Sequence, residues 1–165
     1  MSQDAIYTGV RAFVLSLIQG VEVVQGLGNN VPMPADAFIA LTAVAQARLR
    51  TNVSTYDTIG NTRTVEQGTS YSIQVDCYGP MSSDQATTIC AMWRDEYAFD
   101  MLKQYGCTPL YTSDPTQAAL VNGEENYEQR WTLTAVLQFN PSITVPQQFA
   151  DALQVGFATA DTPTN

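Results

Sequence analysis

The sequence predicts an α+β fold, in which two main helices pack on one face of a largely antiparallel sheet of about five strands. Residues 69–78 and 127–139 alternate apolar and polar side chains with a period of two, which is typical of strands with one buried face. Between these strands, residues 83–105 carry apolar side chains at a helical period. These three segments carry the prediction of the fold class.

The first helix is predicted over Gln3–Ile18. Ser2 can cap its N-terminus, and Asp4 suits the positive end of the helix dipole. One apolar stripe runs along the helix, formed by Ile6, Val10, Phe13, Val14 and Leu17. Gly20 can supply the left-handed residue that ends a helix, and a short strand is predicted over Val21–Gln25.

A long hairpin is predicted across residues 37–78. Residues 37–56 are first apolar and then alternate, and their Thr, Val and Tyr content favours a strand. Asp57–Asn61 contains Gly60 and is predicted to form the turn, after which the second strand runs over about Arg63–Tyr78. Gly68 predicts a bulge or a break in this second strand.

The second helix is predicted over Ser83–Tyr105. Gly79-Pro80 interrupts the preceding strand pattern, and Ser82 or Ser83 can cap the helix. Lys103 lies favourably in the last turn, and Gly106 ends it.

The rest of the chain predicts more strands. Thr108–Tyr111 is a candidate short strand, and Tyr127–Phe139 has the clearest alternation in the sequence. Pro141 closes that strand, and Pro146 is expected to start a short helix through Leu153. Five aromatic residues on periodic apolar faces are expected in the core rather than against a ligand: Tyr71, Trp93, Tyr97, Trp131 and Phe139.

Length and composition favour one domain over residues 1–165, with residues 159–165 as a flexible C-terminal tail. Hydrophobic residues make up 45% of the chain, so it can bury a core, whereas charged residues make up only 14%. Such a surface favours a subunit of an assembly. The alternative is a soluble domain whose surface relies on amide and hydroxyl side chains.

The charge balance argues against a nucleic-acid-binding protein. The net charge is −9, whereas tight binding to phosphates requires clustered cations. The one cationic cluster is Arg48, Arg50 and Arg63, which lies in no nucleic-acid motif. An acidic surface could instead line a path along which nucleic acid slides without specific binding.

The sequence offers little for catalysis. It has no histidine, which removes the common nucleophilic triads and the commonest metal ligand, and its three cysteines follow no metal or disulfide spacing. The Gly26-Leu27-Gly28 run lacks the third glycine of a dinucleotide site. No cofactor or metal is therefore expected. A metal-assisted hydrolase built on Glu96 and Asp100, or on Glu124, Glu125 and Glu128, is the alternative from another functional class.

The same charged residues are candidates for contacts between subunits. Arg48, Arg50 and Arg63 flank the predicted hairpin and could pair with acidic residues of a neighbouring copy. Glu124, Glu125 and Glu128 form an acidic turn and strand start that could face a neighbouring subunit. The alternative for both groups is an ordinary solvated surface. No membrane-spanning stretch and no signal peptide are evident, so no membrane partner is expected.

Several motifs together resemble the phage neck or tail terminator proteins, over about residues 20–158. The first two are Asp76-Cys77-Tyr78-Gly79-Pro80 after the strand and Trp93-Arg94-Asp95-Glu96-Tyr97 in the helix. The others are Leu49–Val53, Pro109–Tyr111, Val121–Glu124, Tyr127–Trp131, Thr134–Gln138 and Pro146–Asp151.

The resemblance implies a structural virion protein without enzymatic activity or cofactor. Such a subunit forms a homo-oligomeric ring, expected to be a hexamer, at the head-proximal end of the tail. The ring ends polymerisation of the tail tube, and of the sheath where one is present, and joins the tail to the head connector. It assembles in the host cytoplasm, and DNA passes through its acidic lumen. The alternative within the neck is a head-completion or connector adaptor protein.

Overall fold

The computed structural model describes residues 3–26, 34, 36–118, 120–121 and 127–150. Over these residues the fold is α+β, with three helices and a large, mostly antiparallel sheet, which confirms the predicted fold class. The single domain over residues 1–165 stays a prediction, and its expected flexible tail lies outside the described residues.

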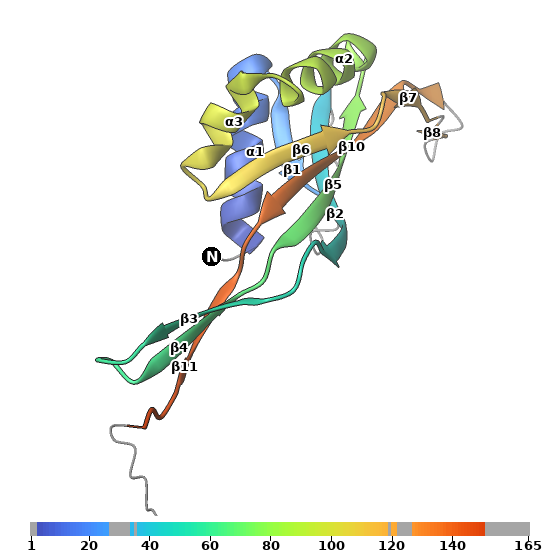
Figure 1. The fold of residues 1–165 in the computed structure, drawn as a ribbon. Coiled ribbons are helices and arrows are strands. Elements are labelled where there is room, and N and C mark those ends of the chain that lie inside the picture. Colours follow the sequence, from blue (N-terminus) through green and yellow to red (C-terminus); the bar gives the residue numbers. More distant parts are fainter. Residues whose placement is uncertain (1–2, 27–33, 35, 119, 122–126, 151–165) are drawn as a thin grey trace, which may run out of the picture.

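The main sheet forms the centre of the fold (Figure 1). Its strands in spatial order are β1 (Glu22–Gln25), β2 (Phe38–Arg48), β5 (Thr69–Tyr78), β10 (Arg130–Phe139) and β6 (Cys107–Thr112). Only β1 and β2 run parallel, and the other neighbours are antiparallel. The short β7 (Thr116–Gln117) pairs with the beginning of β10, whereas β8 (Leu120–Val121) and β9 (Tyr127–Glu128) pair with each other.

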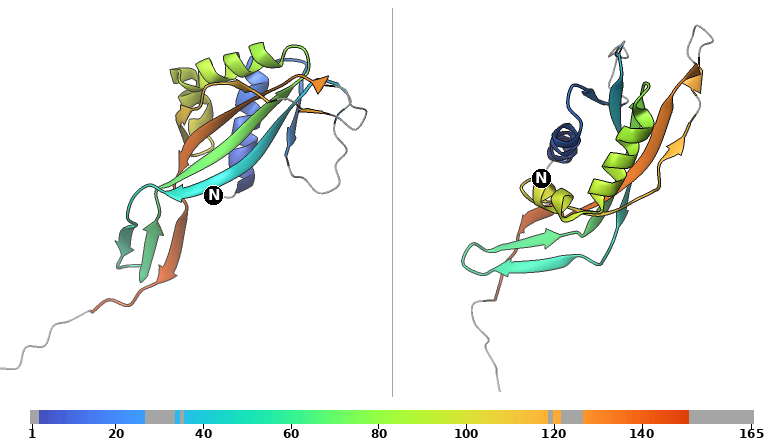
Figure 2. Two further views of the ribbon diagram at one scale, coloured as in Figure 1. Left: turned by 90° about the vertical axis from the view of Figure 1, so that its right-hand side faces the viewer. Right: turned by 90° about the horizontal axis from the view of Figure 1, so that it is seen from above.

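Three helices cover one face of this sheet, as Figures 1 and 2 show: α1 (Gln3–Leu17), α2 (Ser82–Trp93) and α3 (Glu96–Lys103). The alternation of β5 and β10 explains this layer, because every second side chain points to the helices. The buried residues of these two strands on that side are Tyr71, Ile73, Val75, Cys77, Leu133, Ala135, Leu137 and Phe139. They pack against Ile6, Val10, Phe13, Ala86, Ile89, Trp93, Ala98 and Leu102 of the helices.

The predicted second helix is wrong in one respect, because it is divided into α2 and α3. Asp95 adopts an extended conformation, and its Oδ1 accepts a hydrogen bond from the Tyr97 backbone N–H at 2.9 Å. An aspartate side chain competes in this way with helical hydrogen bonding and starts a new helix. The division lets α3 change direction and present Ala98 and Leu102 to the core.

The predicted aromatic core is correct for three residues and only partly correct for two. Tyr71, Trp93 and Phe139 are buried. Trp131 packs against the core but is only half-buried, because it lies near the start of β10, opposite Gln117 of β7. Tyr97 follows the helix division and is 37% exposed.

The predicted long hairpin is confirmed, and its outer half forms an arm that projects from the main sheet (Figures 1 and 2). We call the three-stranded sheet of β3 (Val53–Asp57), β4 (Thr62–Glu66) and β11 (Ser142–Pro146) the arm. β4 and β11 continue the directions of β5 and β10 beyond the helices. The predicted break falls at Gly68, whose carbonyl accepts a hydrogen bond from Leu49 N–H at 2.9 Å.

The short helix predicted from Pro146 is wrong within the described residues. Pro146 is the last residue of β11 and lies opposite Thr62, and residues 147–150 are not helical. Ser142–Pro146 alternates in polarity and pairs with the edge of β4. This strand pairing outweighs the local preference of proline for the start of a helix. Residues 151–153 lie outside the described part of the chain.

Candidate assembly interface

All three arginines of the predicted cationic cluster lie in the arm, at the end of β2 or in the segment that connects the two. Arg48 ends β2, is exposed and donates to Asn52 Oδ1 at 3.3 Å. Arg50 Nη2 lies 2.7 Å from Glu66 Oε1, and both side chains are more than two-fifths exposed, at 44% and 42%. An ion pair this exposed stabilises a fold by less than about 1 kcal/mol. Both arginines therefore contact partners within their own chain.

Arg63 differs from the other two arginines. It lies in the middle of β4, opposite Tyr56 of β3 and Val145 of β11. Its Nε is shielded from solvent and has no hydrogen-bond partner in the described part of the chain. A guanidinium with an unused N–H donor among apolar neighbours favours a carboxylate that approaches from outside.

The arm has two different faces, because directly opposed residues of paired strands share a face. One face, which we call the apolar arm face, consists of Ser54, Tyr56, Arg63, Val65, Ile143 and Val145. The other face carries hydroxyl groups, and the Oγ1 atoms of Thr64 and Thr144 lie 2.9 Å apart. Sequence reasoning found Arg63 but missed its apolar neighbours. The alternation of Ile143 and Val145 between two prolines was the available signal.

Glu128, one of the acidic residues of the predicted interface, lies at the opposite end of β10 from the arm. Glu128 belongs to β9, which comes directly before β10, whereas the arm strand β11 comes directly after it. Ten residues of β10 separate the two ends by roughly 30 Å at the rise of an extended strand. Glu124 and Glu125 lie outside the described residues. The structure thus does not bring Glu128 together with the three arginines within one chain.

A polar cluster occupies the sheet face that carries no helix. Asp76 is 4% exposed and accepts hydrogen bonds from Arg130 and from Gln74 Nε2. The Arg130 guanidinium lies over the Tyr78 ring, which stacks on Phe38 with ring centroids 4.3 Å apart. The oxygens of Asp76 are therefore occupied by partners in the chain. This arrangement is that of a structural ion pair.

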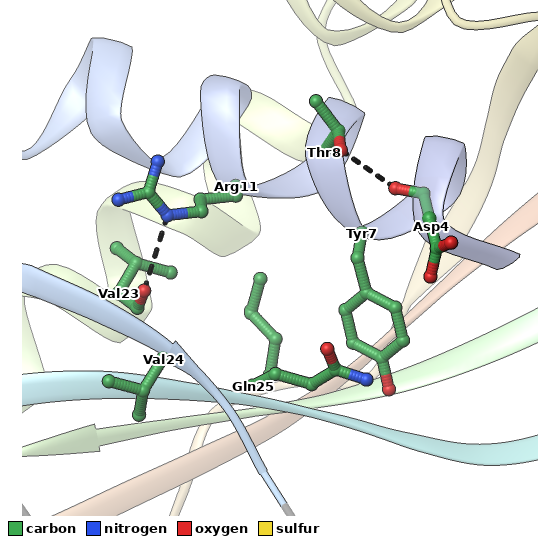
Figure 3. Close-up of a pocket in the computed structure, with 8 residues that line it drawn as sticks. Asp4, Tyr7, Thr8, Arg11, Val23, Val24 and Gln25 are labelled. Atoms are coloured by element: carbon green, nitrogen blue, oxygen red, sulfur yellow. Dashed lines mark hydrogen bonds between the residues drawn. The ribbon is translucent and has the colours of Figure 1, made fainter. Parts of the chain in front are cut away.

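One pocket, of about 230 Å³, lies between α1 and the β1 edge of the sheet (Figure 3). Its polar groups include two that already have partners in the chain. Tyr7 Oη accepts a hydrogen bond from Ala43 N–H at 2.8 Å, and Arg11 Nε donates to the Val23 carbonyl at 3.3 Å. These contacts fasten α1 to β1 and β2.

Catalysis would require a metal site or a reactive nucleophile in the described part of the chain. Within it, no three His, Cys, Asp or Glu side chains are placed to hold a metal ion. Burial raises the pKa of the Cys77 thiol to about 12, with the neighbouring Asp76 charge as a smaller cause. Burial also raises the pKa of the Cys107 thiol to about 11. Both groups are neutral thiols near neutral pH, and a neutral thiol is a poor nucleophile. No described helix has the length and hydropathy of a membrane-spanning segment.

The model of a protein family, the phage neck terminator proteins, matches residues 4–161. The chain belongs to this family. Comparison with curated protein sequences gave no match. Among solved structures, the chain resembles the sheath/tube terminator, in its extended state, of an extracellular contractile injection system named PVC. The two chains are 10% identical with a TM-score of 0.50, and the match covers 99% of this chain and 66% of the other.

The likeness to the injection-system protein concerns the fold, and this neck terminator spans slightly less than two thirds of the length of that chain. Within the neck terminator fold, two of the motifs that carried the resemblance meet. Cys77 and Tyr78 of β5 lie opposite Trp131 and Arg130 of β10. A third motif contacts β6, since Arg94 Nη2 donates to the Thr112 carbonyl at 2.8 Å. These motifs therefore serve the packing of the sheet and its helices.

Proposed function

We propose that this neck terminator forms a ring at the head-proximal end of a phage tail, expected to contain six copies. The ring ends polymerisation of the tail tube, and of the sheath where one is present, and joins the tail to the head connector. The observation that carries the proposal is the family match over residues 4–161. The fold shared with a sheath/tube terminator supports it.

The shape of the chain supports a ring on physical grounds. A ring requires heterologous contacts, in which two different surfaces of each subunit meet. The arm and the β9 end of the sheet are two such surfaces, at opposite ends of β10. β1 and β6 also end the main sheet, and an open strand edge can be completed by a neighbouring subunit.

The residues proposed for contacts with neighbouring subunits or partner proteins remain Arg48, Arg50 and Arg63 together with Glu124, Glu125 and Glu128. Opposite charges on neighbouring copies would steer them into register. The net charge of −9 suits a lumen through which DNA passes without binding. Assembly in the host cytoplasm and residence in the virion neck belong to the same proposal, which includes no enzymatic step.

The proposal is tested with purified tail tube protein that polymerises in vitro. Adding the chain at substoichiometric amounts should stop growth and leave a ring at one end of each tube, visible by negative-stain microscopy. Unchanged tube lengths and bare ends would contradict the proposal. Labelling head-less tails then separates the alternatives, because a terminator stays on such tails whereas a connector adaptor is expected on heads.

A further inference from the structure

Among the described residues, little covers the apolar arm face. Tyr56 is 56% exposed and Ile143 is 66% exposed, and Ile59 at the tip of the arm is 96% exposed. Because the arm projects away from the helices, its face does not pack on them (Figure 1). Phe149 makes one edge contact with the Tyr56 ring, at a centroid distance of 6.1 Å. An exposed apolar surface of this kind marks a docking site.

Arg63 defines what the partner of this face must offer. The ion pairs of the described residues join Arg50 to Glu66, Arg94 to Asp114 and Arg130 to Asp76, and none of them includes Arg63. Its Nε is shielded from solvent and has no partner among the described residues, and Arg63 lies opposite Tyr56 of β3 and Val145 of β11. The complementary surface therefore combines apolar side chains with a carboxylate.

The charge distribution identifies another copy of the same chain as such a partner. Residues 48–68 and 142–150, which form the arm and its flanks, carry three Arg against two acidic residues. The rest of the sequence carries four cations against fourteen acidic residues. Each copy thus combines a cationic arm with an acidic remainder, which favours contacts in which the arm of one copy meets the remainder of the next.

The outer surface of α3 has the required combination. Phe99 is 41% exposed and Tyr97 is 37% exposed, and both stand beside the exposed carboxylates of Glu96 and Asp100. Neither carboxylate makes an ion pair or a side-chain hydrogen bond with the described residues, whereas Asp114 near β6 is already paired with Arg94. Among the described residues, α3 offers two exposed aromatic rings beside two available carboxylates, whereas the start of α2 offers only Met81 and Asp84.

We propose that the apolar arm face of one copy docks on the outer surface of α3 of the next copy, with Arg63 paired to Asp100 or Glu96. The contact joins two different surfaces, so it propagates from head to tail and closes into a ring by rotation. This inference rests on the ring of the proposed function and names the contact that holds it together.

The test uses the full chain in three double variants. The arm variant is Arg63→Glu/Ile143→Asp, and the α3 variant is Phe99→Ala/Asp100→Arg. The control variant, Met81→Ala/Asp84→Arg, changes one exposed apolar residue and one exposed acid at the start of α2. Light scattering gives the mass of each variant alone and of the arm and α3 variants mixed in equal amounts.

Each of the arm and α3 variants should require at least about a 30-fold higher concentration than the wild type to form rings. The mixture should form dimers that do not grow. The α3 variant supplies an intact arm and the arm variant supplies an intact α3, whereas the other two surfaces carry the substitutions. The control variant should form rings as the wild type does. Dimers in the mixture also show that both variants are folded.

Rings formed by the arm variant at the wild-type concentration would overturn the docking contact. A mixture that stays monomeric, while circular dichroism shows that both variants are folded, would also overturn it.

A charge exchange gives a separate test. Arg63→Glu alone should lose ring formation, and Arg63→Glu combined with Asp100→Arg in one chain should restore it. If the wild type and the arm variant both cap tail tubes, the docking contact is wrong but the proposed function stands. If the wild type neither forms rings nor caps tubes, the proposed function fails as well.

Discussion

Arg130 donates two hydrogen bonds to one oxygen of Asp76, with Nε at 3.2 Å and Nη2 at 3.0 Å from Oδ1, although the residues are 54 positions apart in the chain. Asp76 lies near the end of β5 and Arg130 at the start of β10, where the two strands pair. The side chain of Asp76 is 5% exposed and that of Arg130 is 23% exposed. The pair thus connects two central strands on the sheet face without helices.

Replacing Asp76 with Ala should lower the free energy of unfolding by about 2–4 kcal/mol. The substitution leaves the largely buried Arg130 guanidinium and the Gln74 amide without their acceptor, and such a loss exceeds the net value of the bonds themselves. Urea denaturation followed by tryptophan fluorescence measures it. Asp84→Ala, at an exposed position of α2, should change stability by less than about 0.5 kcal/mol. Equal effects of the two substitutions would show that the Asp76 pair is not structural.

Gly79→Ala should destabilise the fold by more than about 1 kcal/mol. Gly79 has a φ of +104°, which side-chain-bearing residues rarely adopt, and an added Cβ would lie 2.7 Å from the Cβ of Ala37. Its N–H also donates to the Gln129 carbonyl at 3.0 Å, so this turn helps to fix the start of β10. Thermal unfolding monitored by circular dichroism gives the change. Gly20→Ala shares the positive φ but meets no atom within 4 Å, so it separates backbone strain from the clash.

The main strands and helices could be predicted from the sequence because each of them buries one face, and this leaves a regular pattern of apolar residues. β5 and β10 alternate almost perfectly, and their registers place Tyr71, Ile73 and Val75 beside Leu137, Ala135 and Leu133. Local hydrogen bonding of Asp95 and distant pairing of Ser142–Pro146 were not predictable in this way. The first depends on a single side-chain conformation, and the second depends on an edge that β4 offers from elsewhere in the chain.

The candidate interface was predicted only by charge. Arg63 stood out because cations are scarce, but nothing near it in sequence indicates that Ile143 and Val145 share its face. That neighbourhood is created when β11 joins the arm. Charge alone could not separate Arg63 from Arg50 either, because the Glu66 partner of Arg50 becomes visible only in the folded arm.

The three cysteines should resist modification in the folded chain. Cys77, Cys90 and Cys107 are buried, and the raised pKa values of Cys77 (about 12) and Cys107 (about 11) keep these two thiols protonated at pH 8. Ellman's reagent should therefore label fewer than one thiol per chain within minutes, and three after denaturation in urea. Rapid labelling of the native chain would contradict the burial of these residues.

The same two thiols make stability depend on pH in the alkaline range. An unfolded thiol loses its proton near pH 9, whereas the folded Cys77 and Cys107 hold theirs up to about pH 12 and 11. Their contribution is thus fully present below about pH 8.5 and is lost as the pH rises toward the folded values. For the wild type, the urea concentration at the midpoint of unfolding should be lower at pH 10 than at pH 7.5. The fall should be smaller for Cys77→Ala, which removes one of the two titrating groups.

Trp93→Ala should cost more stability than Trp131→Ala, although both residues lie on apolar faces of their elements. Trp93 is 2% exposed, meets the Phe13 ring edge-on at 5.4 Å and donates from Nε1 to the Val136 carbonyl at 3.3 Å. Removing it leaves a cavity between α2 and β10 and an unpaired carbonyl, at a cost of about 3–5 kcal/mol. Trp131 is only half-buried, so water can fill part of the space that its side chain leaves. Trp131→Ala should therefore cost about 1–2 kcal/mol less stability than Trp93→Ala. Urea unfolding of both variants, followed by far-ultraviolet circular dichroism so that the missing tryptophan does not affect the signal, tests the order. A larger loss for Trp131 would mean that the start of β10, rather than the contact between α2 and the sheet, holds the fold together.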